Sequence, residues 1–299
     1  MQGRSRLRFT IVTPTLNRRA LLEQALDSVL AQRHGNVEHI VVDGGSTDGT
    51  LEMLKERAGV TVLRDRGLGL YDAINLGIDS ASGDVIGLLN SDDLYAPGAF
   101  AVAEQGFASA PEADAVCGKA ELFDESGVLE RYDDPRDLAL DPHAALIGAC
   151  IPNARFFRRE VFDKVGLFSL DYPHIADRHF LARTLIAGLK TVPLDALVYR
   201  YRQHGGSLTF AEGVTEGEAL RSELLKLARE IAVRPDAPES LKYKARTLQG
   251  RCLVTLARGR LAAGHPGEAL EFLTSVNGRP SLAPMAALAA AMLDKVRGR

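Results

Sequence analysis

The chain has 299 residues, of which 46% are hydrophobic and 25% are charged, as in an ordinary globular protein. Its 36 Lys and Arg residues against 39 Asp and Glu residues leave a net charge of −3, which argues against a nucleic-acid partner. Cys117, Cys150 and Cys252 show no metal-ligand spacing, so we expect no zinc site and a reducing, cytoplasmic setting. No apolar run approaches the ~20 residues of a membrane span.

The first half of the chain alternates short apolar runs with stretches of helical periodicity. The apolar runs predict strands over residues 9–13, 37–42, 60–63 and 84–89. The periodic stretches between them predict helices over residues 22–30, 48–54 and 71–81. Strands that alternate with helices are typical of an α/β fold with right-handed crossovers and a mainly parallel, Rossmann-like sheet flanked by helices.

The second half changes character twice. Between about residues 115 and 202, a hairpin around Asp124–Gly127, a helix over 177–187 and an extended segment over 191–201 are expected. After about residue 209 only helical patterns remain. These predict helices over 219–231, 241–263, 266–273 and 283–296. We therefore expect a main domain over residues 1–210 and a C-terminal helical extension over 211–299.

Polar side chains follow the predicted strands at the points where the strands end. Thr13, Asp43 and the pair Asp92 and Asp93 all occupy such positions. Ligands of parallel sheets bind at this edge, so the coincidence indicates a site. Adjacent carboxylates suit Mg²⁺ or Mn²⁺, but a turn or a helix cap explains them equally well from spacing alone. The glycine-rich segment after Asp43 has the composition of a structural turn.

Two further residues are candidates with weaker support from the sequence. Asp177 begins a predicted helix, where a carboxylate serves either as a general base or as a partner of the helix dipole. His204 lies in a polar turn and is either a ligand or a surface residue.

Several motifs, taken in order, resemble the family 2 glycosyltransferases, which have the GT-A fold. The resemblance covers about two-thirds of the chain and leaves out the tail after about residue 210. The matching segments are Phe9–Arg18, Leu26–Gln32, Val41–Thr50, Gly69–Ile78 and Gly83–Asp93, with weaker matches at Phe156–Arg159, Val165–Phe168 and Ala176–Arg178. The Gly69–Ile78 segment is most similar to bacterial members that build polysaccharides and surface glycans.

The resemblance implies an inverting hexosyl transfer from a UDP-, GDP- or dTDP-sugar to an acceptor hydroxyl, with Mn²⁺ or Mg²⁺ as cofactor. It implies Asp177 as the general base. It assigns the metal to Asp93, with His204 near the metal or the diphosphate. Asp43 would contact the base of the donor, and Asp92 would lie nearer its ribose. The donor-binding residues implied are Thr13, Pro14, Thr15, Asp43 and Asp92.

Alternatives remain open at this stage. The second hypothesis is a nucleotide-sugar-binding scaffold without catalysis, and a nucleotidyltransferase or a Rossmann oxidoreductase is less consistent with the motifs. A glycan or a lipid-linked molecule is the expected acceptor. Residues 211–299 hold 14 Lys and Arg against 10 Asp and Glu, which permits peripheral contact with the inner face of an anionic membrane. Packing of the tail onto the main domain is the first interpretation, and formation of a homodimer is the second.

Overall fold

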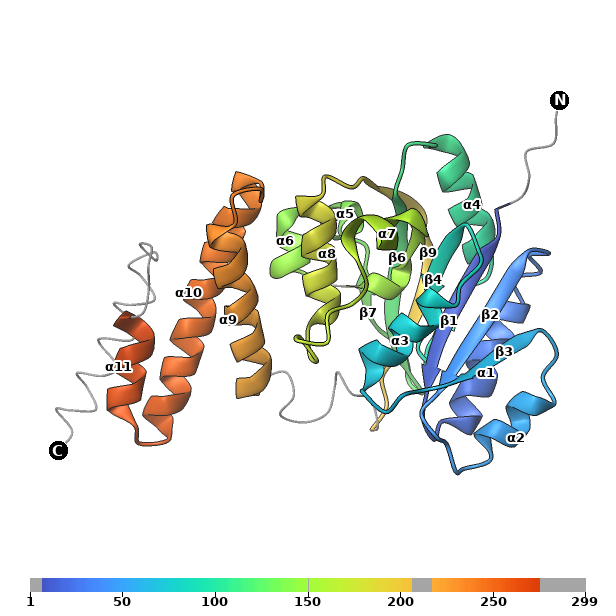
Figure 1. Cartoon of the computed structure of the whole chain (residues 1–299), viewed down its shortest axis with the longest axis horizontal. Coiled ribbons are helices and arrows are strands. Elements are labelled where there is room, and N and C mark those ends of the chain that lie inside the picture. Colours follow the sequence, from blue (N-terminus) through green and yellow to red (C-terminus); the bar gives the residue numbers. More distant parts are fainter. Residues whose placement is uncertain (1–6, 150, 206–216, 275–299) are drawn as a thin grey trace. The chain divides into compact units, whose positions relative to one another are not determined.

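A computed structural model describes residues 7–149, 151–205 and 217–274 (Figure 1). The chain divides into two compact units, Met1–Phe210 and Ala211–Arg299. The helix predicted over 283–296 and the side chain of Cys150 lie outside the described residues.

A nine-stranded sheet forms the centre of the described part of the first unit, in the order β3-β2-β1-β4-β8-β6-β9-β5, with β7 paired to β6. The strands are β1 (Phe9–Thr15), β2 (Val37–Asp43), β3 (Val60–Arg64), β4 (Val85–Leu88), β5 (Leu94–Tyr95), β6 (Ala115–Asp124), β7 (Gly127–Tyr132), β8 (Arg155–Arg158) and β9 (Thr191–Arg202).

Strand direction divides the sheet into two parts. β1 pairs in parallel with both β2 and β4, and β2 pairs in parallel with β3, as alternation with helices requires. β8 then runs antiparallel to β4 and β6, whereas β9 returns parallel to β6. The predicted α/β class with a GT-A-type sheet flanked by helices is confirmed. The short strands β5 and β8 were not predicted, because two to four residues carry too little periodicity.

Helices cover the sheet of the first unit (Figure 1). They are α1 (Arg19–Leu30), α2 (Thr50–Lys55), α3 (Leu70–Asp79), α4 (Ala99–Ser109), α5 (Pro135–Ala139), α6 (Pro142–Leu146), α7 (Glu160–Val165) and α8 (Ala176–Ile186). The core beneath them includes the buried rings of Phe9, Phe100 and Phe156, which contact one another. α3 approaches β1 so closely that a Cβ at Gly77 would lie 2.3 Å from Cγ1 of Val12.

The strand register brings the polar strand ends to one edge. Thr15 at the end of β1 pairs with Asp43 at the end of β2, and Asp43 pairs with Arg64 at the end of β3. The chain order reverses between β1 and β4, which are neighbours in the sheet. Such a reversal leaves a crevice at the carboxyl edge, because the connections on its two sides lead away from each other.

The described part of the second unit contains α9 (Glu218–Val233), α10 (Glu239–Ala262) and α11 (Pro266–Thr274). α9 and α10 form a helical hairpin with buried apolar side chains, among them Leu227 and Leu253. Within residues 7–149, 151–205 and 217–274, no helix is both long enough and apolar enough to cross a membrane.

Candidate functional site

A cavity of about 470 Å³ opens at the carboxyl edge, where β1 and β4 lie side by side; we call it the Asp92 cavity. Residues that follow β1, β3 and β4 line it together with the end of β9, as the reversal of chain order predicts. The lining residues are Pro14, Thr15, Leu16, Arg18, Gly44, Asp65, Gly67, Gly69, Leu70, Ala73, Asn90, Ser91, Asp92, Asp93, Tyr201 and Arg202.

Two buried polar atoms in this lining lack a hydrogen-bond partner within the described residues. They are Oγ1 of Thr15 and Oδ1 of Asp65. Leaving such an atom unpaired costs about 1–3 kcal/mol, so a buried orphan needs an explanation. A ligand in the cavity that offers N–H or O–H groups would pair both atoms. Thr15 was predicted as a donor-binding residue, whereas Asp65, directly after β3, was not.

Asp43 and Thr13 are not among the lining residues of this cavity and are engaged by other protein groups. The backbone N–H groups of Gly45 and Ser46 donate to Oδ1 of Asp43 at 2.8 and 2.9 Å, and the Ser46 hydroxyl donates to Oδ2 at 2.6 Å. Asp43 therefore shapes the loop whose next residue, Gly44, lines the cavity. The hydroxyl of Thr13 lies 2.9 Å from Nε2 of buried His39.

Asp92 takes part in a three-membered cluster at the mouth of the Asp92 cavity. Its Oδ2 lies 3.1 Å from Nε2 of His204 and 3.3 Å from Nη1 of Arg18. The same Nη1 lies 2.9 Å from Nε2 of His204. The structure thus brings together Asp92 and His204, which are 112 positions apart in the sequence.

Asp93 is 1% exposed and is held by three protein donors. The Tyr199 hydroxyl donates to its Oδ2 at 2.6 Å, the Asn90 amide donates to the same oxygen at 3.0 Å, and the backbone N–H of Arg202 donates to Oδ1 at 2.8 Å. Burial, and then the charge of Asp92, raises the pKa of Asp93 to about 7, although these hydrogen bonds act in the opposite direction.

Asp92 and His204 carry the oxygen and nitrogen donors that a divalent cation needs. Among the described residues, no three His, Cys, Asp or Glu side chains converge on one point. However, Oδ2 of Asp92 and Nε2 of His204 lie 3.1 Å apart, and neighbouring ligands of an octahedral Mg²⁺ at ~2.1 Å are separated by ~3.0 Å. Mg²⁺ is commonly held by one or two carboxylates together with substrate phosphates. The pair therefore fits a cation that a substrate also coordinates.

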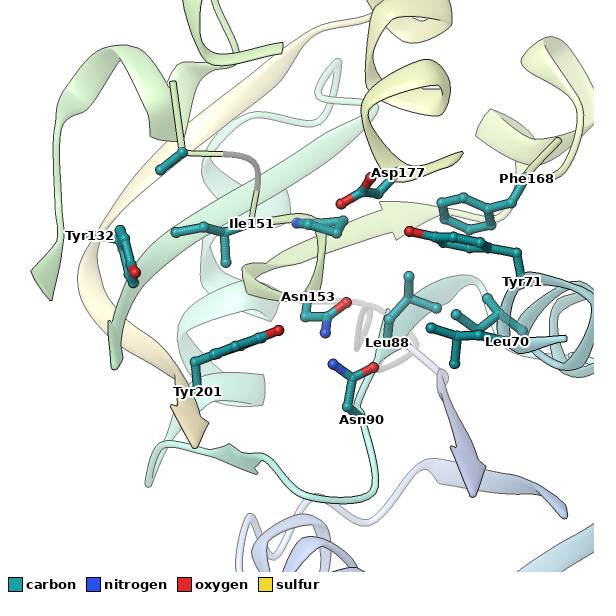
Figure 2. A pocket seen from close by; sticks show the side chains of 13 residues that line it. Leu70, Tyr71, Leu88, Asn90, Tyr132, Ile151, Asn153, Phe168, Asp177 and Tyr201 are labelled. Carbon is teal, nitrogen blue, oxygen red and sulfur yellow. The ribbon is translucent and has the colours of Figure 1, made fainter. Parts of the chain in front are cut away.

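A second cavity, of about 310 Å³, contains Asp177 and is called the Asp177 cavity (Figure 2). Leu70, Asn90 and Tyr201 line both cavities, so the two adjoin. Figure 2 shows the Asp177 carboxylate and the Tyr71 hydroxyl directed into the same space. Its lining residues are Leu70, Tyr71, Ile74, Leu88, Asn90, Tyr132, Ala149, Ile151, Pro152, Asn153, Phe168, Asp177 and Tyr201.

Asp177 lies in the first turn of α8, and the loop before this helix is fixed to α3. Asn75 of α3 donates from Nδ2 to the backbone oxygen of Phe168 at 2.8 Å and accepts from its backbone N–H at 2.9 Å. The Phe168 ring also stacks on Tyr71, with centroids 5.6 Å apart. α3 therefore aligns the chain that leads to Asp177.

A buried hydrogen-bond network joins the two cavities. The Tyr199 hydroxyl, which donates to Asp93, accepts from Nδ2 of Asn153 at 3.0 Å and from the backbone N–H of Asn90 at 3.3 Å. Asn153 lines the Asp177 cavity and Asp93 lines the Asp92 cavity. No local sequence pattern predicts the Asn153–Tyr199 pair, since the two residues come from η1 (Pro152–Ala154) and β9.

The chain has no Trp, and its sequence offers Tyr71, Tyr95, Tyr172 and Tyr199 as candidates for stacking on a sugar. Tyr71 lines the Asp177 cavity. The other three are buried, with Tyr95 and Tyr199 packed edge to face in the core and Tyr172 stacked on His179.

Comparisons with known proteins agree with one another. Residues 10–166 match the model of glycosyl transferase family 2. A PGL/p-HBAD biosynthesis glycosyltransferase of Mycobacterium tuberculosis is 33% identical over 213 residues, which cover 66% of this chain and 78% of that protein. An uncharacterized glycosyltransferase of Nostoc sp. is 25% identical over 267 residues, or 80% of this chain and 81% of that protein.

Solved structures share the fold at low sequence identity. S. aureus TarS in complex with UDP-GlcNAc has a TM-score of 0.65 and 18% identity, over 83% of this chain and 72% of that chain. The mannosyltransferase PcManGT from Pyrobaculum calidifontis, in complex with GDP-Man and Mn²⁺, has a TM-score of 0.61 and 18% identity, over 97% and 81% of the two chains. The family match covers more than half of the chain, so this protein is a glycosyltransferase that belongs to glycosyl transferase family 2.

Proposed function

We propose that the protein is an inverting, divalent-cation-dependent hexosyltransferase. A nucleotide-diphosphate sugar binds in the Asp92 cavity, and the acceptor hydroxyl enters the Asp177 cavity. The observation that carries the proposal is that the two cavities adjoin through Leu70, Asn90 and Tyr201. Asp92 and Asp93 therefore line one side of a joined space, and Asp177 lines the other side.

The donor side is supported by the unpaired atoms of the Asp92 cavity. Oγ1 of Thr15 and Oδ1 of Asp65 have no hydrogen-bond partner among the described residues. A nucleoside carries N–H and O–H groups on its base and its ribose that can donate to both atoms. The Asp43 carboxylate accepts hydrogen bonds from the backbone of Gly45 and Ser46. These bonds hold the loop that contains Gly44, which lines the Asp92 cavity. The two structural neighbours bind UDP-GlcNAc and GDP-Man, which is consistent with a UDP-, GDP- or dTDP-sugar here.

Asp177 is the proposed general base. As the acceptor oxygen attacks the anomeric carbon, its proton passes to the Asp177 carboxylate, a new C–O bond forms and the bond to the diphosphate breaks. One displacement inverts the anomeric centre without a covalent enzyme intermediate. A positioned general base contributes about 10²–10⁴-fold to such a step.

The leaving diphosphate gains negative charge, so the site needs cations. A divalent cation, when bound, supplies Lewis-acid stabilisation of that charge. Asp92 and His204 are the proposed ligands, and the Mn²⁺ of the mannosyltransferase neighbour is consistent with this role. The resemblance also implies Asp93 as a metal ligand. Among the described residues Asp93 does not converge on one point with Asp92 and His204, so its side chain would have to reorient to complete the set.

A glycan or lipid-linked acceptor in the synthesis of bacterial surface polysaccharide is the proposed biological setting. The support is the mycobacterial relative named for PGL/p-HBAD biosynthesis. The basic excess of residues 211–299 is compatible with peripheral contact at the inner face of the cytoplasmic membrane.

Asp177→Asn tests the central assignment. The amide is isosteric but cannot accept the proton, so we expect turnover to fall by about 10²–10⁴-fold. Donor binding should be unchanged, because Asp177 lies in the other cavity. A thermal-shift screen of UDP-, GDP- and dTDP-sugars with Mn²⁺ first identifies the donor, since a ligand of the native state raises the melting temperature.

Asp171→Asn is the matched control, because Asp171 is an exposed carboxylate in the loop before α8. We expect its turnover to equal that of the wild type. Wild-type turnover in Asp177→Asn would refute the assignment of the base. Release of the nucleoside diphosphate without any Mn²⁺ or Mg²⁺ would refute the cation dependence.

A further inference from the structure

The Arg18 guanidinium occupies a position where a cation is also expected. Its Nη1 lies 3.3 Å from Oδ2 of Asp92 and 2.9 Å from Nε2 of His204, while these two atoms are 3.1 Å apart. When Nε2 is unprotonated, it and Oδ2 are both acceptors. Two acceptors held this close repel each other unless a positively charged donor contacts both of them. Arg18 supplies that group in the structure.

We propose that Arg18 is a displaceable internal cation, which competes with a divalent cation for the Asp92–His204 pair. The inference rests on the proposed function in one respect, because it takes this pair to be the cation site. With Arg18 in place the pair is neutralised and the cluster is stable. When the divalent cation takes the pair, the guanidinium is released into the Asp92 cavity, which it lines.

The surroundings of Arg18 support exchange rather than a fixed ion pair. The side chains of Arg18 and Asp92 remain 22% and 18% exposed, so an ion from solution reaches them. Asp93, by contrast, is 1% exposed and is held by protein donors. A divalent cation from solution can therefore compete with Arg18 for Asp92.

The backbone before Arg18 is held in place while its side chain exchanges. Asn17 has a φ of 51°, a left-handed conformation that Asn tolerates better than most residues. Its Oδ1 accepts from the backbone N–H of Thr47 at 2.8 Å, and its own N–H donates to Ser46 Oγ at 2.8 Å. These bonds fix the start of α1, so only the flexible side chain of Arg18 needs to move.

Mn²⁺ binding to the full-length protein without donor tests the proposal, with free Mn²⁺ followed by electron paramagnetic resonance. Arg18→Gln removes the competitor, so its Mn²⁺ Kd should be about tenfold lower than that of the wild type, which corresponds to about 1.4 kcal/mol. Arg18→Lys keeps the positive charge and should stay near the wild-type Kd. Circular dichroism confirms that the variants are folded.

Arg19→Gln is the matched control for net charge. Arg19 is exposed at the start of α1, and its guanidinium lies against Gly49. Its removal should change the Mn²⁺ Kd by less than about twofold, because exposed charges are screened. An equal gain in affinity in Arg19→Gln and Arg18→Gln would show a general charge effect and would overturn the proposal.

Asp92→Asn and His204→Ala separate this inference from the proposed function. Both variants should weaken Mn²⁺ binding. If they do so while Arg18→Gln leaves the Kd unchanged or higher, the competition is refuted and the cation site stands. If neither variant changes the Kd, the pair is not the cation site, and both the site and the competition fail.

Discussion

Replacing Tyr199 with Phe removes one oxygen atom from the centre of the buried network. The Tyr199 side chain is fully buried, and its hydroxyl donates to Oδ2 of Asp93 at 2.6 Å. The same hydroxyl accepts from Nδ2 of Asn153 at 3.0 Å. Tyr199→Phe keeps the ring and its packing, so the hydrogen bonds alone are lost.

The expected loss of stability follows from these contacts. A hydrogen bond to a charged group contributes about 1.5–3 kcal/mol, and a buried donor left without a partner, here the Asn153 amide, costs about 1–3 kcal/mol. Because the network relaxes in part, we expect Tyr199→Phe to lower the free energy of unfolding by about 2–4 kcal/mol when Asp93 is ionised.

The effect should depend on pH in a defined direction. Burial raises the pKa of Asp93 from 3.8 to about 7, so ionisation of Asp93 lowers the stability of the wild type as pH rises from about 4 to about 7. The Tyr199 hydrogen bond lowers this pKa, because it stabilises the ionised carboxylate. Without it the pKa rises further. Tyr199→Phe should therefore cost more at pH 8, where Asp93 is ionised, than at pH 5, where it is protonated.

Urea denaturation followed by circular dichroism at pH 5 and pH 8 measures both effects. Tyr132→Phe is the control, since its hydroxyl donates to the exposed Glu130 at 3.0 Å, and its removal should change stability by less than about 0.5 kcal/mol. A loss below about 0.5 kcal/mol for Tyr199→Phe at pH 8, or equal losses at both pH values, would refute the reasoning.

Two further predictions use other buried groups. Burial, and then the charge of Arg57, lowers the pKa of His39 from 6.5 to about 3, so His39 contributes a loss of stability as pH falls below 6.5, in the opposite direction to Asp93. Urea denaturation of the wild type and His39→Gln measures this contribution as the difference between the two proteins, which should change by about 2 kcal/mol between pH 7.5 and pH 5; a constant difference would contradict it. Asp65→Asn should weaken binding of UDP or GDP about tenfold without changing the melting temperature, because no group among the described residues pairs with Oδ1 of Asp65; unchanged affinity in calorimetry would exclude a contact between Asp65 and the nucleotide.

The alternation of strands and helices could be predicted because buried positions are apolar and recur in the sequence with the period of the element that they belong to. β1 is buried along its whole length, as its continuous apolar run predicts, and β2, β3 and α3 lie within a few residues of their expected bounds. The carboxyl edge followed from the parallel topology, and with it the positions of Asp43, Asp92 and Asp93. Elements as short as α7 and β8 contain too few residues to show a period, and their positions depend on tertiary pairing.

The residues that sequence reasoning missed have in common that their partners are distant in the chain. Asn153 pairs with Tyr199 across 46 positions, and Tyr199 pairs with Asp93 across 106. No local pattern encodes such pairs. Asp65 could have been found, because it lies two residues after the strand predicted over 60–63, close to the kind of position that drew attention to Asp43.

The acidic pair shows most clearly what spacing alone leaves open. Asp92 and Asp93 are adjacent, and the sequence treats them as nearly equivalent. In the turn after β4 their side chains point to different surroundings. Asp93 is buried against Tyr199 and β9, whereas Asp92 faces Arg18 and His204 at the cavity mouth. The charges of two neighbouring carboxylates repel each other. Here Asp93 is stabilised by three neutral hydrogen-bond donors, and Asp92 is stabilised by the Arg18 cation. A divalent cation that binds Asp92 would take over the role of the Arg18 guanidinium, so we expect metal binding to begin with displacement of Arg18.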